Sequence, residues 1–167
     1  MAMTAKRIDA VATAAGLVIN GHLFAKKVPL KCYYDALGPP SRTVDAGPPA
    51  PAGHRNNQVH IFSADGIYLT EHHASGLVDS VNFVFDGADC PFAIDEAFSG
   101  RLIVGGRQFC TNMSENDLDL SLFVRDLPGE YNLKYENCWV GISAKGRRDT
   151  KGKRRKPRYI TEVSICF

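Results

Sequence analysis

Several features that mark particular protein classes are missing from this 167-residue sequence. No apolar run approaches the roughly 20 residues that a membrane-spanning helix needs. The five cysteines are odd in number, widely scattered and never spaced as Cys-x-x-Cys. Such thiols are typical of a reducing compartment rather than of a disulfide-stapled secreted domain. We therefore expect a cytoplasmic protein that does not span or bind a membrane.

Short catalytic and cofactor motifs are also missing. No serine, cysteine or threonine stands in a nucleophile-elbow sequence, and the Gly105-Gly106 pair lacks the Lys-Ser/Thr of a phosphate-binding loop. Glu71, His72 and His73 form the densest group of potential metal ligands, but neighbouring strand residues point to opposite faces. Exposed hairpin histidines are the simpler interpretation. An enzyme stays open, but we expect a protein without catalytic activity, metal or cofactor.

The strongest signal that is present is an internal repeat. Residues 77–85 and 159–167 both alternate apolar and polar positions and both end on phenylalanine. The strand-turn-strand pattern of residues 17–24 likewise resembles that of 102–109. Such similarity predicts two related units. The alternative is that alternating strands resemble one another without any duplication.

The expected fold is α+β, with two similar antiparallel β-rich units, each with a short helix, packed as one compact domain over 1–167. The first unit covers about 17–85 and the second about 101–167. Residues before 17 are rich in alanine and favour a short helical lead-in. Residues 46–57 contain several prolines and read as a surface loop rather than a proline-rich ligand.

Local patterns predict the individual elements. Asn20-Gly21 is a strong hairpin turn, and Ser114 with Asp117 has the spacing of a capping box that opens a helix. The remaining expected elements are a helix at 30–37, strands at 42–45, 58–62, 67–71 and 77–85 in the first unit, and strands at 101–104, 108–111, 131–135, 139–144 and 159–167 in the second. The alternation predicts that one set of side chains faces the core. This set contains Val81, Phe83, Phe85, Val163, Ile165 and Phe167.

The net charge of +2 hides a strong asymmetry. Nine of the 14 residues from 145 to 158 are basic, and we call this segment the basic loop. The rest of the chain has 11 basic and 17 acidic residues, a net charge of −6. The basic loop is either a solvated hairpin tip or a nucleic-acid contact, because each neutralised phosphate releases counterions. Its candidate contacts are Arg147, Arg148, Lys153, Arg154, Arg155 and Lys156.

Three short strings carry a resemblance to a known family. Residues 37–42 (Leu-Gly-Pro-Pro-Ser-Arg), 65–68 (Asp-Gly-Ile-Tyr) and 98–100 (Phe-Ser-Gly) resemble small bacterial proteins encoded beside secreted toxins, mostly immunity proteins or domains of unknown function. The resemblance covers roughly 17–106. It implies a cytoplasmic antitoxin that neutralises a cognate effector, such as a type VI secretion nuclease toxin, by occluding its active site or blocking its assembly. The long proline-rich insertion and the basic loop depart from the family pattern.

If the partner is a nuclease with a basic groove, the acidic body is the expected binding surface. The two acidic segments are then expected to be neighbours, with Tyr68 and Trp139 as apolar anchors. The alternatives are that the carboxylates only keep the protein soluble and that both aromatic side chains are core residues. The candidate acidic contacts are Asp86, Asp89, Asp95, Glu96, Glu115, Asp117 and Asp119.

Overall fold

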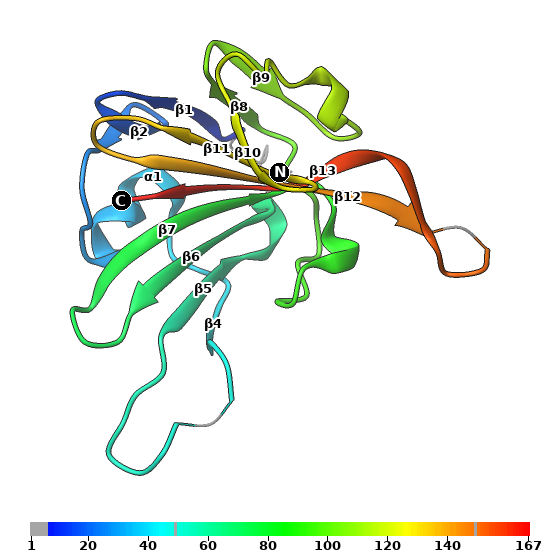
Figure 1. Cartoon of the computed structure of the whole chain (residues 1–167). Coiled ribbons are helices and arrows are strands. Elements are labelled where there is room, and N and C mark those ends of the chain that lie inside the picture. The colour runs from blue at the N-terminus through cyan, green and yellow to red at the C-terminus, as the bar shows by residue number, and fades with distance from the viewer. Residues whose placement is uncertain (1–6, 49, 149) are drawn as a thin grey trace, which may run out of the picture.

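The protein folds into two packed β-sheets with a few short helical turns (Figure 1). The computed structural model describes residues 7–48, 50–148 and 150–167. It is 47% strand and 10% helical, which confirms the expected α+β class. The helical segments are η1 (Leu30–Tyr33), α1 (Tyr34–Leu37), η2 (Ser63–Asp65), η3 (Gly87–Asp89) and η4 (Glu115–Asp117). Within the described part of the chain, no helix is both long and apolar enough to cross a membrane.

The smaller sheet has five strands. Its order is β3 (His22–Phe24), β2 (Gly16–Ile19), β1 (Asp9–Thr13), β8 (Arg101–Val104) and β9 (Arg107–Phe109). Its pairs are antiparallel except for β1 and β8, which run parallel.

The larger sheet has eight strands, all paired antiparallel. Its order is β10 (Val124–Leu127), β11 (Glu130–Lys134), β12 (Trp139–Arg148), β13 (Arg154–Cys166), β7 (Leu77–Val84), β6 (Ile67–His72), β5 (Gln58–Phe62) and β4 (Arg42–Asp45).

The two halves of the chain contribute strands in the same order. The hairpins β2–β3 and β8–β9 flank β1 in the smaller sheet, and the meanders β4–β7 and β10–β13 meet at the β7–β13 pair in the larger one. This shared order is what a duplication produces. The superposition of units 17–85 and 101–167 stays a prediction.

The main core lies between the sheets at the junction of the two halves. Val163 faces Phe83 and Ile165 faces Val81 across the β7–β13 pair, and all four side chains are fully buried. Phe85 is also buried, whereas Phe167 is partly exposed and packs against the same cluster. The expected set of core-facing side chains is therefore confirmed at the buried positions. A register slip of one residue would turn this whole set outward.

The N-terminal segment is a strand rather than the expected helical lead-in. Ala10 and Ala12 of β1 are buried in the core, and the strand pairs with β2 on one side and β8 on the other. Two neighbouring strands satisfy its backbone groups, and this tertiary pairing outweighs the helix preference of alanine. Residues 1–6 of the expected lead-in lie outside the described residues.

The second unit has a single helical turn where a helix was expected. Ser114 and Asp117 do form the capping box, but the turn ends at Leu118. The following leucines recur every two residues, which does not place them on one helix face. Leu118 is buried, whereas Leu120 is 62% exposed. The expected loop 46–57 joins β4 to β5, and most of its described residues are exposed; Pro49 lies outside the described set.

Candidate functional site

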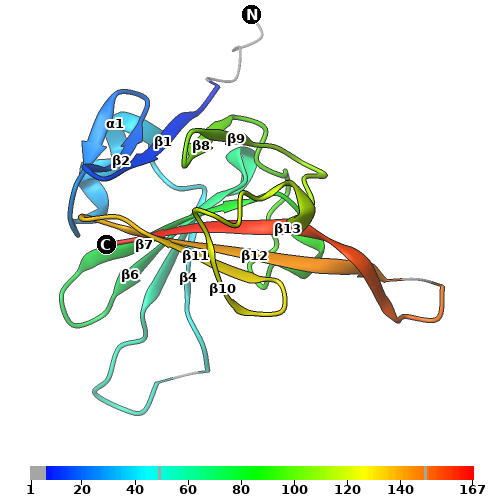
Figure 2. The ribbon, with the colours of Figure 1, turned by 45° about the horizontal axis from the view of Figure 1, so that its top comes forward.

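Most of the segment predicted as a basic loop is a two-stranded β-ribbon. The β11–β12 pairing runs from Trp139 to Ser143, and the β7–β13 pairing uses residues 162–166. Beyond these, β12 and β13 continue to pair with each other, from Ala144 opposite Ile160 to Arg148 opposite Arg154. We call residues 144–161 the basic ribbon. It projects from the body of the molecule in both views (Figures 1 and 2). Asp149 lies outside the described residues.

Gly146 lets the two strands of the basic ribbon approach closely. A Cβ atom at this position would lie 2.2 Å from the backbone oxygen of Arg155. The strand register also shifts between Gly146 and Arg148, which marks a bulge. Bulges strengthen the local twist and re-aim side chains. The glycine therefore allows the two charged strands to pair closely, and the bulge twists them and re-aims their side chains.

A partly buried ion pair holds the base of the basic ribbon. The Arg158 guanidinium donates to Glu115 at 3.2 Å, and the Tyr131 hydroxyl donates to the same carboxylate at 2.6 Å. The two charged side chains are only 22% and 12% exposed. Burial alone would raise the pKa of Glu115, but the hydrogen bonds from Tyr131 and Arg158 hold that pKa below its usual value. Glu115 is thus a structural carboxylate rather than a surface contact.

Backbone contacts add to this base on both strands. The Ile160 amide donates to the Met113 carbonyl at 2.8 Å, and the Ala144 amide donates to the Gly129 carbonyl at 2.7 Å. Gly129 has a φ of 86° and approaches so closely that a Cβ atom would lie 2.2 Å from the Ala144 oxygen. The base of the ribbon is therefore fixed to the 111–118 segment on one side and to the β10–β11 turn on the other.

Two basic hollows lie on the two flanks of the ribbon base. One, of about 350 Å³, borders the segment after β7; the other, of about 500 Å³, borders the β10–β11 turn. Each also contains one carboxylate, Asp86 in the first and Glu130 in the second. The basic residues of the first hollow are Lys145, Arg147, Arg148 and Arg154. Those of the second are Lys145, Arg154, Arg155, Lys156 and Arg158.

Arg147 is anchored at the base by an aromatic ring. Its guanidinium lies 3.9 Å from the ring centroid of Tyr159 and donates a hydrogen bond to the Asn112 side chain. This cation–π contact covers the face of Tyr159. The remaining predicted nucleic-acid contacts are exposed along the ribbon. They are Arg148, Lys153, Arg154, Arg155 and Lys156. The structure thus gathers all six on one projecting element.

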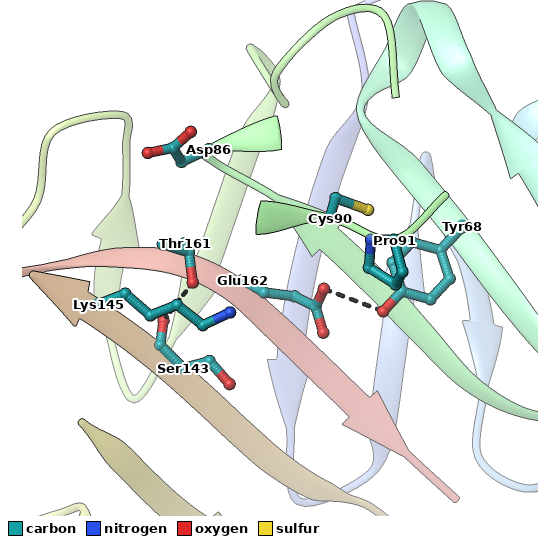
Figure 3. A pocket seen from close by; sticks show the side chains of 8 residues that line it. All are labelled: Tyr68, Asp86, Cys90, Pro91, Ser143, Lys145, Thr161 and Glu162. Carbon is teal, nitrogen blue, oxygen red and sulfur yellow. Dashed lines mark hydrogen bonds between the residues drawn. The ribbon is translucent and has the colours of Figure 1, made fainter. Parts of the chain in front are cut away.

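A smaller polar pocket of about 180 Å³ adjoins the ribbon on the outer face of the larger sheet (Figure 3). The Tyr68 hydroxyl donates to Glu162 at 2.9 Å, and the Ser164 hydroxyl donates to the other carboxylate oxygen at 3.1 Å. Burial raises the pKa of Glu162 despite these hydrogen bonds. Lys145 lines this pocket as well as both basic hollows. The pocket therefore extends the polar surface around the ribbon base.

The two aromatic residues named as partner anchors differ in exposure. Tyr68 is only 8% exposed and packs in a small cluster beneath Phe92, so it is not a surface anchor. Trp139 is 45% exposed at the start of β12. Val124 and Leu127 on the edge strand β10 are also exposed, at 67% and 65%. Most of the large exposed apolar side chains of the described residues thus lie in the second unit, although Leu23 and Tyr34 of the first unit are also exposed.

The acidic candidates serve mainly as local hydrogen-bond acceptors. Asp86 accepts from the Ala88 amide at 3.0 Å, and Asp95 accepts from the Ser63 hydroxyl. Backbone hydrogen bonding from Ser114 lowers the pKa of Asp117, and hydrogen bonds from Ser121 likewise lower that of Asp119. Glu96 is exposed, and the side chain of Asp89 lies outside the described part of the chain.

The two acidic segments pack against different hydrophobic clusters. The 86–96 segment packs Phe92 and Ile94 against the cluster that contains Val84. The 115–119 segment packs Leu118 into the main core, which contains Phe83. Adjacent strand residues point to opposite faces, so Phe92 and Leu118 pack on opposite faces of the larger sheet. Asp86 and Asn112 nevertheless line one hollow near the ribbon base.

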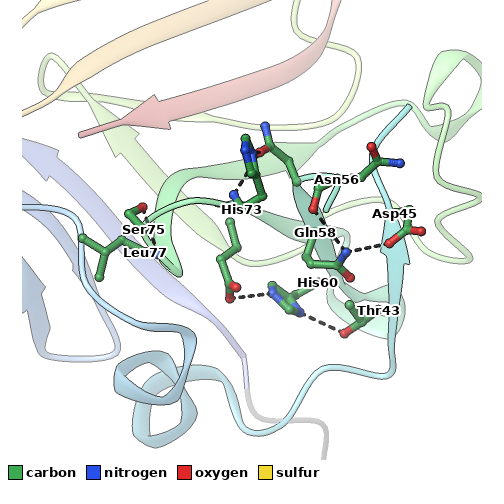
Figure 4. Close-up of polar contacts among 10 residues, drawn as sticks. Thr43, Asp45, Asn56, Gln58, His60, His73, Ser75 and Leu77 are labelled. Atoms are coloured by element: carbon green, nitrogen blue, oxygen red, sulfur yellow. Dashed lines mark hydrogen bonds and ion pairs between the residues drawn. The ribbon is translucent and has the colours of Figure 1, made fainter. Parts of the chain in front are cut away.

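Of the potential metal ligands Glu71, His72 and His73, Glu71 contacts His60, whereas the His72 and His73 rings stack with centroids 4.8 Å apart. Figure 4 shows the hydrogen bonds of this region. The buried His60 ring bridges Thr43 at 2.9 Å and Glu71 at 3.0 Å, which ties β4 to β5 and β6. The exposed His73 contacts the Asn57 side chain at 2.9 Å. Among the residues that the structure describes, no three histidine, cysteine or acidic side chains gather in a metal-binding arrangement. Sequence patterns missed this His60 bridge because its members are far apart in the chain.

Comparisons with known proteins give a family but no function. No curated protein and no solved structure matches the chain. Residues 11–119 match the model of a domain of unknown function, DUF7738. The match ends before β10, so the basic ribbon lies outside it. Because the match spans more than half of the sequence, the chain belongs to the DUF7738 family.

Proposed function

We propose that the protein is a non-enzymatic binding protein that holds nucleic acid through the basic ribbon. The observation that carries this proposal is the concentration of nine basic residues on one projecting, clamped element. The remainder of the chain has a net charge of −6 and repels a phosphate backbone. Electrostatics therefore direct a polyanion to the ribbon and away from the body.

The affinity in this proposal comes mainly from the release of counterions. Each phosphate neutralised by a lysine or arginine releases condensed cations, so the logarithm of the binding constant falls with the logarithm of salt concentration. Arg158 is engaged with Glu115 and belongs to the base rather than to the contact surface. The exposed residues toward the tip supply the phosphate contacts.

The test is fluorescence anisotropy with a labelled oligonucleotide at salt concentrations between about 50 and 200 mM. The variant Lys153→Gln/Arg155→Gln/Lys156→Gln removes three exposed ribbon charges. It should bind more weakly and reduce the salt slope by about 2–3, because each contact contributes about 0.9. The matched control changes three exposed lysines elsewhere to glutamine, namely Lys26, Lys31 and Lys134. Equal losses in both variants, or no loss in the ribbon variant, would contradict the proposal.

A second candidate function is the neutralisation of a cognate toxin, which the family resemblance implies. The observation that favours it is the exposure of Trp139, Val124 and Leu127 on β10 and β12, since exposed aromatic residues often anchor protein interfaces. Co-expression with the product of the adjacent gene tests it. Trp139→Ala should then abolish protection from that product, whereas the Lys153/Arg155/Lys156 variant should still protect. Protection by Trp139→Ala equal to the parent would remove this candidate.

A further inference from the structure

We propose that the basic ribbon enters the major groove of double-helical DNA, so that a duplex is the form of nucleic acid it holds. This inference rests on the proposed function and specifies its ligand. Three features of the ribbon support it. They are its dimensions, its charge on both flanks and the lack of aromatic residues between 145 and 158.

The dimensions match a DNA groove. Strands rise about 3.3 Å per residue and pair about 4.8 Å apart, so the five residues of β12 from Ala144 to Arg148 extend about 15 Å. The major groove is about 12 Å wide and 8.5 Å deep and admits a two-stranded ribbon. The minor groove is narrower, about 6 Å wide, and two paired strands lying side by side enter it only where the duplex is bent.

The charge distribution suits a groove with two phosphate walls. The hollow beside Asp86 and the hollow beside Glu130 lie on opposite flanks of the ribbon base, and each is lined by at least four basic residues. Arg154 borders both hollows. A flat anionic surface meets only one side of a projecting ribbon, whereas the walls of a groove meet both sides at once. The duplex therefore neutralises more of the ribbon's charge.

The aromatic content argues against a single strand as the preferred ligand. Proteins that hold single strands stack the bases on aromatic side chains, and each stack contributes about 1–3 kcal/mol. Residues 145–158 contain no aromatic residue. The nearest ring, Tyr159, lies beneath the Arg147 guanidinium. The ribbon thus offers charge without a stacking platform.

The clamped base keeps the ribbon ready for insertion. The Arg158–Glu115 pair and the Ala144–Gly129 hydrogen bond fix both strands where they leave the body. An ordered arm avoids part of the entropy loss that a flexible loop suffers on binding. Contacts from arginine and lysine to phosphates also carry no direct sequence information. Binding is therefore expected to vary little with base sequence.

The experiment compares four probes with the full-length protein at one salt concentration. They are a 20-base-pair duplex of about two helical turns, one of its strands alone, heparin, and the same duplex with bulky substituents on thymine C5, which lies in the major groove. We expect the plain duplex to bind at least about tenfold more tightly than the single strand. The C5 substituents should weaken duplex binding by a similar factor, because they fill the groove.

The outcomes separate this inference from the proposed function. Equal or tighter binding of the single strand, or duplex binding unaffected by C5 substituents, overturns groove insertion but leaves nucleic-acid binding intact. Heparin binding alone overturns both, as does the absence of binding to every probe. The Lys153→Gln/Arg155→Gln/Lys156→Gln variant must bind the duplex more weakly while keeping the circular dichroism spectrum of the parent. Undiminished duplex binding in that variant also counts against the ribbon.

Discussion

Glu115→Gln tests how the base of the basic ribbon is held. The substitution keeps the shape of the side chain and an acceptor for Tyr131 but removes the negative charge that faces Arg158. Arg158 is then left mostly buried beside a neutral amide. Loss of a charge-assisted bond in such a setting lowers the free energy of unfolding by about 1–3 kcal/mol.

The size of this effect is measurable by urea unfolding. For a denaturant dependence of about 2 kcal/mol per molar, the loss moves the unfolding midpoint down by about 0.5–1.5 M. Circular dichroism at pH 7 follows the transition. Glu96→Gln is the matched control, because that carboxylate is exposed. Its free energy of unfolding should stay within about 0.5 kcal/mol of the parent value.

The dependence on pH makes the prediction specific to an ionised Glu115. The folded state lowers the pKa of this carboxyl from its ordinary value of 4.5. It therefore stabilises the fold fully above about pH 4.5, and this stabilisation is lost as the pH falls through the lower folded-state pKa. The gap between parent and variant should be largest at neutral pH and should narrow in acid. An equal gap at pH 7 and pH 3, or none at pH 7, would refute the reasoning.

Three further substitutions probe other positions. Gly146→Ala places a Cβ atom against the Arg155 backbone oxygen, so urea unfolding should show a free energy of unfolding lower by about 1–3 kcal/mol. Weaker oligonucleotide binding should accompany this loss. An unchanged unfolding midpoint would contradict the close approach. Tyr68→Phe removes a hydrogen bond from Glu162, which should cost about 1–2 kcal/mol and raise the pKa of that carboxyl further, as NMR titration can show. Trp139→Ser should change stability by less than about 1 kcal/mol, and a larger loss would show that the side chain packs more than its exposure indicates.

The strands with local signals could be predicted from the sequence. Asn20-Gly21 forms the turn between β2 and β3, and the alternation of β7 and β13 places Phe83 and Val163 in the core. Turn chemistry and a period of two are properties of a few consecutive residues. These signals can therefore be recognised without knowledge of the tertiary fold.

Elements that depend on distant partners could not be predicted in this way. β1 carries alanines, and its pairing with β2 and with β8, far along the chain, makes it a strand. Edge strand β10 has no alternation between buried and exposed positions, because all four of its residues are exposed. The charged strands of the basic ribbon likewise lack an apolar face. Their pairing continues from the sheet that contains Ile142 and Val163.

The candidate site was only partly visible in the sequence. The excess of basic residues between 145 and 158 can be counted in the sequence. The projection of this segment as a ribbon cannot be predicted there, because it begins where β12 stops pairing with β11 and β13 stops pairing with β7. The sequence predicted Glu115 only as one of several surface carboxylates. Its contacts with Tyr131 and Arg158 join residues 16 and 43 positions away, and no local pattern reports them.

The central place of β1 between the two hairpins has a consequence for synthesis of the chain. Asp9 and Arg101 meet across the β1–β8 pair although they are 92 residues apart. At a translation rate of about 5–20 residues per second, β1 waits about 5–20 s for its parallel partner to be made. During that interval the edge of β1 is an open template for strands of other chains. The nascent protein is therefore most exposed to misassembly before β8 emerges, and a chaperone that covers residues 9–13 would protect it during that interval.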